Sequence, residues 1–362
     1  MIIIHKMLRD FKFLFQKKPS YIIFWIEQLC NFTCEHCFNY IENTKKQNNL
    51  TLDEINKISK NLGHLKYVTL AGGEPMIRKD VFEIINIFKK NNDLQMVNIV
   101  TNGWFVDKIK NLTERVLSEL PDLSINFGIS IDGLEAEHDF IRQKKGSFKK
   151  CCETLNELAI ISEKNSNKKL SFVVNGVYTA QNANTILETS NFFIDKMKVP
   201  YTICLVRGED IQNNEYKKVN VDHYYETYKK ITQKNESVYS KNYPYKNIRL
   251  AVEDIMTEII YDSAKHNKIT VPCKAGKKGF VLNSSGDMLL CELLNINLGN
   301  VKDYDYDPIK ILELQNSKHE IKKIIDEKCH CTWECFQRMN IVHSPSLYPK
   351  VLSNLAKRKF GY

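Results

Sequence analysis

The sequence has no long hydrophobic run. None of its apolar stretches reaches the roughly 18 residues that a membrane-spanning helix needs. The first 20 residues lack the small-residue cleavage site of a secretory signal peptide, and no low-complexity tract or internal repeat is evident. These absences argue against an integral membrane protein, a secreted protein and a repeat protein, and they predict a globular protein of the cytoplasm.

Concentrated charge is also scarce. Lysine and arginine outnumber aspartate and glutamate by 52 to 43, a formal net charge of +9, but the excess is spread along the chain. Proteins that bind nucleic acid usually gather basic residues among stacking aromatic residues. We therefore expect no nucleic-acid partner, whereas an anionic small molecule is compatible with this charge.

Residues 1–20 are predicted to form a short basic amphipathic helix. Apolar side chains recur there at helical spacing, namely Ile4, Met7, Leu8, Phe11 and Leu14. We expect this helix to pack on the outside of the domain. Contact with a membrane surface is the alternative.

The chain contains eleven cysteines. Without an export signal, a disulfide framework is not expected, and clustered cysteines are more typical of metal ligands. Eight of them form two groups: Cys30, Cys34 and Cys37 near the start, and Cys273, Cys291, Cys329, Cys331 and Cys335 in the last quarter. We expect the other three, Cys151, Cys152 and Cys204, to be buried structural thiols.

Apolar runs of strand length alternate with stretches of helical period. The predicted strands cover residues 21–27, 66–72, 96–102, 125–131, 170–177 and 201–206, and Thr51 with Glu54 predicts a helix start with a capping box. This alternation indicates an α/β fold with a parallel sheet. Six units without a clear seventh or eighth predict a partial (β/α)6 barrel, whose chemistry should gather at the carboxyl ends of the strands.

The predicted organisation divides the chain into five parts. After the N-terminal helix, residues 21–207 form the barrel and residues 208–264 a connecting helical region. A small C-terminal domain, rich in cysteine, follows at residues 265–340, and residues 341–362 form a tail.

The spacing C-x3-C-x2-C of Cys30, Cys34 and Cys37 directly follows the first predicted strand. It resembles the radical S-adenosylmethionine (SAM) superfamily, in which three thiolates hold a [4Fe–4S] cluster and the fourth iron binds SAM. The resemblance implies these three cysteines as catalytic cluster ligands. A zinc site completed by His36 or by a distant residue is the alternative, because zinc accepts three cysteines and one histidine.

Further segments resemble the same superfamily. Gly72, Gly73 and Glu74 precede Pro75 in a GGEP motif, and the resemblance implies that this loop binds the amino group of SAM. It also implies contacts with SAM from residues at the later strand ends: Asn102, Ser130, Asp132, Arg142 and Asn175. Arg142 would bind the carboxylate of SAM. Asn102 and Asn175 are the weaker candidates, since loop asparagines often bond only to backbone.

The second cysteine group resembles the auxiliary-cluster domains called SPASM and twitch. Gly286 and Cys291 form a G-x4-C element after Cys273, and Cys329, Cys331 and Cys335 have the spacing C-x-C-x3-C. A full SPASM domain has seven cysteines, but this segment has five. We therefore expect one auxiliary [4Fe–4S] cluster with one thiol to spare, which the spacing does not identify. Zinc is the alternative metal.

The resemblance implies an enzyme that reductively cleaves SAM and abstracts a hydrogen atom from a substrate. A one-electron donor of the flavodoxin or ferredoxin type is the implied partner. The cysteine count and the 29 residues before Cys30 favour a small polar metabolite, such as a sugar or cyclitol that is oxidised or epimerised. The alternatives are radical modification of a peptide or protein and a non-enzymatic iron–sulfur or zinc protein. Arg207 is a candidate for binding an anionic substrate group.

Overall fold

The computed structural model describes residues 14–39, 48–165, 169–208, 211–239 and 246–360. Most of the predicted N-terminal helix, including Ile4, Met7, Leu8 and Phe11, lies outside the described residues. No helix of the described chain has the length and apolar character to cross a membrane.

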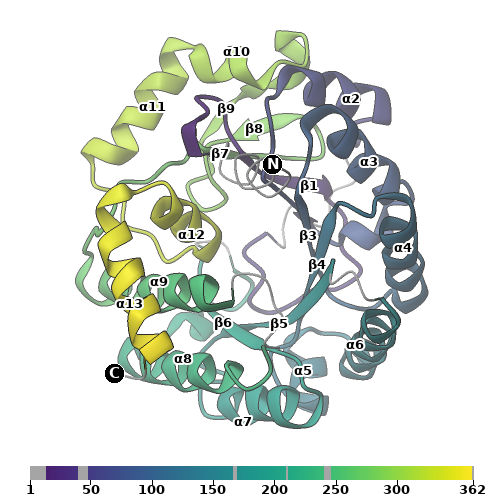
Figure 1. Cartoon of the computed structure of the whole chain (residues 1–362), viewed down its shortest axis with the longest axis vertical. Coiled ribbons are helices and arrows are strands. Elements are labelled where there is room, and N and C mark those ends of the chain that lie inside the picture. Colours follow the sequence, from purple (N-terminus) through teal and green to yellow (C-terminus); the bar gives the residue numbers. More distant parts are fainter. Residues whose placement is uncertain (1–13, 40–47, 166–168, 209–210, 240–245, 361–362) are drawn as a thin grey trace.

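The described chain is built around one twisted sheet of nine strands in the order β6-β5-β4-β3-β2-β1-β7-β8-β9 (Figure 1). The first six strands run parallel and follow the chain: β1 (Tyr21–Glu27), β2 (Tyr67–Gly72), β3 (Met96–Thr101), β4 (Ser124–Ser130), β5 (Leu170–Tyr178) and β6 (Tyr201–Leu205). The expected partial barrel of six β/α units is confirmed, with strand ends within one residue of the predicted ones.

The C-terminal segment extends the same sheet. Strand β7 (Gly279–Leu282) pairs in parallel with β1, so that Tyr21 lies opposite Gly279. Strands β8 (Asp287–Leu289) and β9 (Asn297–Asn300) then follow in antiparallel order. The sheet therefore has no break at the predicted boundary near residue 265.

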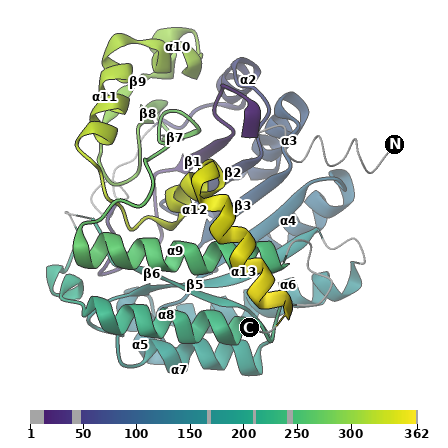
Figure 2. The same ribbon diagram turned by 60° about the vertical axis from the view of Figure 1, so that its left-hand side comes forward.

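Helices form an outer layer around the strands (Figure 1). Those of the barrel are α2 (Leu52–Asn61), α3 (Val81–Asn92), α4 (Val106–Glu119), α5 (Glu135–Ile141), α6 (Ser147–Lys164) and α7 (Ile186–Asn191). The connecting region contains α8 (Val221–Asn235) and α9 (Lys246–His266), and α10 (Pro308–Glu313), α11 (Gln315–Asp326), α12 (Glu334–Val342) and α13 (Tyr348–Phe360) follow. The predicted tail is therefore mostly helix: α13 crosses α9 and packs on it (Figure 2).

Local sequence explains how these elements form. The Thr51 side chain accepts a hydrogen bond from the Glu54 backbone N–H and Glu54 bonds back, which is the predicted capping box. In β3, Val97 and Ile99 are fully buried under the helices, while Asn98 between them faces the other side of the sheet and is half-buried. Polar residues on the strands therefore face the interior of the barrel.

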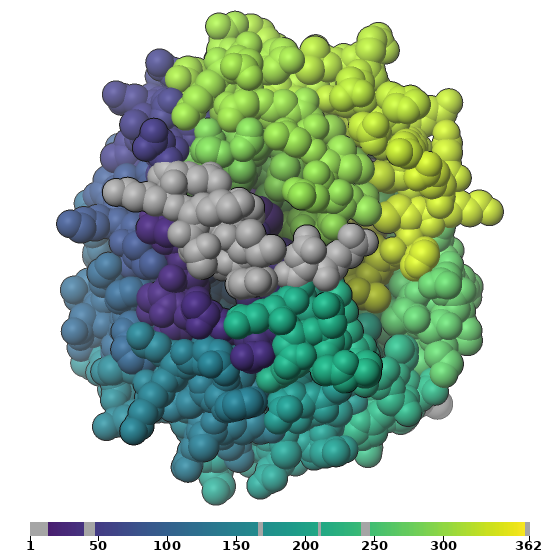
Figure 3. All heavy atoms as spheres, turned by 180° about the vertical axis from the view of Figure 1, so that it is seen from behind, coloured from purple at the N-terminus to yellow at the C-terminus, as the bar shows by residue number. Residues whose placement is uncertain are grey.

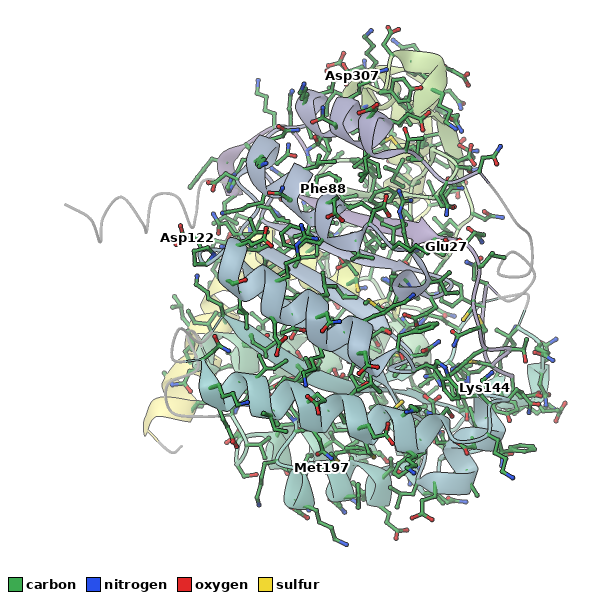
Figure 4. The ribbon with its side chains drawn as sticks, turned by 90° about the vertical axis from the view of Figure 1, so that its right-hand side faces the viewer. Glu27, Phe88, Asp122, Lys144, Met197 and Asp307 are labelled. Atoms are coloured by element: carbon green, nitrogen blue, oxygen red, sulfur yellow. The ribbon has the colours of Figure 1, made fainter. Side chains whose placement is uncertain are left out.

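The carboxyl ends of the parallel strands lie together on one side of the molecule. Glu27, the last residue of β1, and Lys144, which follows α5, lie on that side in Figure 4. Asp122, which precedes β4, lies on the opposite side. The GGEP loop and residues 102 and 130–132 all follow strands on the Glu27 side, where the candidate site is expected.

Candidate functional site

The first cysteine group lies in the loop that follows β1. Cys34 is buried, Cys30 and Cys37 are half-buried, and the Cys37 backbone N–H donates to the Cys34 carbonyl at 3.1 Å. Burial, and then the charge of Glu74, raise the pKa of Cys30 to about 12; Cys34 and Cys37 add to this rise. The three thiols are therefore close enough to repel one another as thiolates, and a bound cationic metal would relieve that repulsion.

Each of the three sulfurs has a hydrogen-bond donor beside it. The Arg142 guanidinium lies 3.8 Å from Cys34 Sγ. Backbone hydrogen bonds from Phe32 and Asn39 oppose the rise in the pKa of Cys30 and Cys37, respectively. Donors of this kind stabilise thiolate ligands and tune iron–sulfur clusters. The loop thus fits a cluster held by three cysteines.

The two glycines of the GGEP motif are required by the cysteine loop itself. The Gly73 N–H donates to the Glu27 carbonyl and the Glu74 N–H to the Leu29 carbonyl, both at 2.9 Å. A Cβ at Gly73 would lie 2.3 Å from the Leu29 oxygen, and one at Gly72 would lie 2.1 Å from the Glu27 oxygen. The backbone that approaches these glycines is therefore the segment just before Cys30.

The carboxylate of Glu74 is buried between β2 and β3. It accepts hydrogen bonds from Thr101 Oγ1 at 2.7 Å, from the Asn102 N–H at 2.7 Å and from the Met76 N–H at 3.0 Å. Burial raises the pKa of Glu74 to about 7, although these bonds oppose the rise. Glu74 thus joins the ends of the two strands beside the cysteine loop.

Asp132 and Arg142 form a buried ion pair next to Cys34. Arg142 Nε donates to Asp132 Oδ2 at 2.5 Å, and the Val177 N–H donates to Oδ1 at 2.8 Å. Burial alone would raise the pKa of Asp132, but the charge of Arg142 lowers it below its ordinary value. Asp132 therefore orients the guanidinium, and its predicted contact with SAM stays a prediction.

The residues around Arg142 fix its position. His138 Nδ1 accepts the Asp132 N–H at 3.2 Å, and Asp139 accepts the N–H groups of Gly146 and Phe148. His36 is buried with Nε2 3.8 Å from Asp132 Oδ2, and its Nδ1 has no hydrogen-bond partner among the residues that the structure describes. Burial lowers the pKa of both His36 and His138 to about 4.

The remaining predicted SAM contacts lie at the same edge of the sheet. Asn102 Nδ2 donates to Asn31 Oδ1 at 2.8 Å, which ties β3 to the cysteine loop. Ser130 lies opposite Asn175 in the sheet and is half-buried. Asn175 Oδ1 accepts a hydrogen bond from Thr202 at 2.9 Å. These side chains line the strand ends, and their roles as ligands stay predictions.

Four cysteines of the second group line one cavity: Cys273, Cys291, Cys329 and Cys331. Cys335 lies outside its lining and instead makes a hydrogen bond with Tyr21 on β1. Burial raises the pKa of Cys291 to about 11, and the neighbouring Cys273 and Cys329 add to this rise. Cys335 is thus the member of the second group that lies outside the lining of this cavity.

Three of the cavity cysteines accept backbone hydrogen bonds. The donors are the N–H groups of Ala275, Leu294 and Trp333, at 3.4, 3.4 and 3.1 Å from Cys273, Cys291 and Cys331. This arrangement fits a cluster held by four thiolates. Within the residues that the structure describes, no three or more His, Cys, Asp or Glu side chains surround a single metal-ion position.

Arg207 joins the end of β6 to the second cysteine segment. It donates to the Thr332 carbonyl at 2.6 Å and to Glu334 at 2.5 Å, and its guanidinium lies 4.3 Å from the centre of the Trp333 ring. The sequence predicted a substrate contact for Arg207. Its hydrogen bonds are with the chain between Cys331 and Cys335 and with the Cys204 side chain on β6, and a contact with substrate stays a prediction.

The sequence did not predict the contacts between the two cysteine groups. Phe38, beside Cys37, packs edge-on against Trp333 with ring centres 5.5 Å apart. Glu292, beside Cys291, accepts a hydrogen bond from Trp25 Nε1 at 3.0 Å, and burial raises its pKa to about 7. In the sequence, the one feature that could have pointed to Phe38 and Glu292 is that each lies directly beside a cysteine.

Residues 28–193 match the radical SAM superfamily. The chain is 30% identical to the GTP 3′,8-cyclase of Haemophilus ducreyi over 125 residues, which are 33% of this chain and 35% of that protein. It is 23% identical to the AdoMet-dependent heme synthase of Methanosarcina barkeri over 302 residues, covering 80% and 82% of the two chains. The chain thus spans about a third of the cyclase.

Solved structures share the fold at lower identity. Streptococcus suis SuiB bound to S-adenosylmethionine has a TM-score of 0.60 and 16% identity, over 88% of this chain and 71% of SuiB. The structure of anSMEcpe with bound AdoMet has a TM-score of 0.57 and 17% identity, over 95% of this chain and 98% of that one. These likenesses extend through the C-terminal region and show a shared architecture.

Proposed function

We propose that this chain, which contains a radical SAM domain over residues 28–193, is an enzyme that reductively cleaves SAM and abstracts a hydrogen atom from a small polar metabolite. The observation that carries the proposal is the loop of three thiols at the carboxyl edge of the sheet, with Glu74 and Arg142 beside it. A radical SAM domain uses a [4Fe–4S] cluster and SAM.

Cys30, Cys34 and Cys37 would hold the cluster. When bound, it supplies one electron that splits SAM into methionine and a 5′-deoxyadenosyl radical, which takes a hydrogen atom from the substrate. Arg142 is held by Asp132 with its guanidinium beside Cys34, where it would bind the SAM carboxylate. The carboxylate of the buried Glu74 would accept a hydrogen bond from the amino group of SAM.

In the C-terminal region, Cys273, Cys291, Cys329 and Cys331 would hold one auxiliary cluster, and Cys335 would not be a ligand. The shared cavity and the three backbone donors support this assignment. Arg207, through Thr332 and Glu334, would keep the segment of Cys331 against the barrel.

Polar side chains inside the barrel support a small polar substrate. Thr69, Asn98, Asn126 and Ser171 occupy one row across four neighbouring strands. Asn126 donates to Asn98 at 2.6 Å and accepts from Ser171 at 2.8 Å, so that these three side chains are linked, and the row carries no net charge. A neutral row of donors and acceptors suits a hydroxyl-rich molecule better than an apolar one.

A peptide substrate is the second candidate. SuiB has been solved with its precursor peptide SuiA, and anSMEcpe with the Cp18Cys peptide. Deuterium transfer separates the two candidates: a deuterated cyclitol or sugar that labels 5′-deoxyadenosine supports the metabolite. If only a deuterated peptide transfers deuterium to 5′-deoxyadenosine, the proposed metabolite substrate is wrong.

The proposal that the chain is an enzyme is tested with anaerobically reconstituted protein, SAM and dithionite. We expect 5′-deoxyadenosine from the wild type and none from Cys34→Ala. About eight irons per chain are expected for two four-iron clusters. If fully loaded wild-type protein forms no 5′-deoxyadenosine, the proposal of an enzyme is wrong and a non-enzymatic metal protein becomes the better explanation.

A further inference from the structure

A groove lies on the outer surface of the C-terminal region, with a volume of about 470 Å³. Its apolar floor consists of Leu312, Ile321 and Ile325, and three lysines, Lys277, Lys318 and Lys322, stand around it. Helices α10 and α11 are at the periphery of the molecule in Figure 1, and Figure 3 shows the yellow-green surface of this part of the chain. An outside partner can therefore reach the groove.

The charge at the groove is mostly uncompensated. Within the described residues, Lys277 and Lys318 have no carboxylate partner, and both are exposed. Lys322 lies 3.9 Å from Asp326, a contact between exposed groups that is weak in water. The groove thus offers an apolar floor with a positive rim, which is complementary to an acidic surface with a few apolar side chains.

The groove adjoins the cavity of the four cysteines. Ile324 of α11 lines that cavity, whereas Ile321 and Ile325 of the same helix line the groove. Gly276, three residues after Cys273, forms part of the other wall. It packs so closely against Ile321 that a Cβ at position 276 would lie 2.5 Å from the Ile321 side chain. The groove and the cysteine cavity are therefore lined by neighbouring residues of the same helix.

We propose that this groove docks an acidic one-electron carrier protein of the ferredoxin or flavodoxin type. The inference rests on the proposed function in its oxidising form. After hydrogen-atom abstraction, the substrate radical loses one proton to water and one electron to become the oxidised product. The oxidised carrier accepts that electron and is thereby reduced by one electron. Charge complementarity would speed the encounter and make it sensitive to salt.

Titration with an oxidised acidic [2Fe–2S] ferredoxin tests the proposal, using the holoprotein at low and high ionic strength. We expect Lys277→Glu/Lys318→Glu to weaken binding by about tenfold or more at low salt, because two attractions become repulsions. Lys322→Glu and Lys323→Glu form a matched pair on α11, since Lys322 lines the groove and Lys323 does not. The first should weaken binding and the second should change it by less than about twofold.

Equal weakening by Lys322→Glu and Lys323→Glu would overturn the proposal, because general charge would then explain binding. Wild-type affinity in the double variant would overturn it as well. Binding of a polyglutamate peptide without binding of ferredoxin would make the groove a peptide site instead. Circular dichroism and iron content check that each variant is folded and loaded.

The proposed function is tested separately in the same samples. Dithionite-supported formation of 5′-deoxyadenosine needs no carrier, so the groove variants should retain the wild-type rate. Absence of 5′-deoxyadenosine from the wild type would defeat the proposed function, while the ferredoxin titration would still decide whether the groove docks a carrier.

Discussion

At the residue scale, the site depends on buried charges that are paired. Asp132 is fully buried and holds Arg142 beside Cys34. A buried pair costs desolvation energy, and breaking it by removing one partner leaves an uncompensated charge. The pair is therefore more informative about function than about stability, because it places a cation next to the Cys34 sulfur at a desolvation cost that an apolar pair would avoid.

Asp132→Asn should destabilise the protein and weaken SAM binding. The buried guanidinium loses its counter-charge, for which we expect a loss of about 3–5 kcal/mol in the free energy of unfolding. Urea denaturation of the variant measures it. Asp305→Asn breaks an exposed pair with Lys310 and should cost less than about 1 kcal/mol. Similar losses in the two variants would contradict the structural role of Asp132.

Cys331→Ser and Cys335→Ser should differ in iron content. Cys331 lines the cavity, whereas Cys335 bonds to Tyr21. After anaerobic reconstitution, Cys331→Ser should lose the irons of the auxiliary site, about four per chain, and Cys335→Ser should keep them. Iron and sulfide analysis measures this, and loss of the iron from Cys335→Ser would refute the assignment.

At the element scale, the loops at the carboxyl ends of β1, β2 and β3 support one another. The loop after β2 donates two backbone hydrogen bonds to the segment before Cys30. Asn102, after β3, donates a hydrogen bond to Asn31, which directly follows Cys30. The cysteine loop is therefore braced by the two neighbouring strands, which reduces the conformational freedom that its cluster would otherwise have to remove.

Gly73→Ala should displace the cysteine loop. Its Cβ would meet the Leu29 oxygen at 2.3 Å, and such overpacking usually costs about 1–3 kcal/mol. We expect reduced iron in the first site and a lower urea midpoint. Gly63→Ala is the control, because its Cβ would approach only the Lys18 side chain, at 3.4 Å. Full iron binding by Gly73→Ala would show that the loop tolerates the displacement.

At the scale of the whole molecule, the C-terminal region and the barrel share a sheet. Strand β7 pairs with β1 over four residues, and Leu282 lies opposite Phe24. Helices α12 and α13 also pack on α9 of the connecting region (Figure 2). The two parts are therefore expected to unfold together rather than as independent domains.

Leu282→Ala should lower the stability of the barrel as well as that of the C-terminal region. Leu282 is buried, and its truncation should cost about 2–5 kcal/mol. Hydrogen exchange should then accelerate in β1 as well as in β7. Leu352→Ala, at a position that is 64% exposed, should cost less than about 0.5 kcal/mol. Unchanged protection of β1 in Leu282→Ala would show that the parts unfold separately.

The sequence was sufficient to predict the six parallel strands and to place the candidate residues of the first site at one edge of the sheet. Hydrophobic alternation and the capping box at Thr51 are local signals, so they survive without knowledge of the fold. The sequence did not indicate which side chains these residues contact. The contact of Asp132 with Arg142 was not predicted, because ten residues of turn and helix bring the guanidinium back to the strand end; a contact of Asp132 with SAM stays a prediction.

The spacing of residues along the chain was sufficient to place the strands, the helix starts and the two cysteine groups, because periodicity and short-range spacing are properties of neighbouring residues. Tertiary structure alone decided that β7 joins β1, that Cys335 lies apart from the four cavity cysteines, and that Arg207 holds the segment of Cys331. The strand pairing, the Arg207 contact and the hydrogen bond of Cys335 with Tyr21 each join residues more than 100 positions apart. They depend on how packed elements meet, which no local pattern specifies.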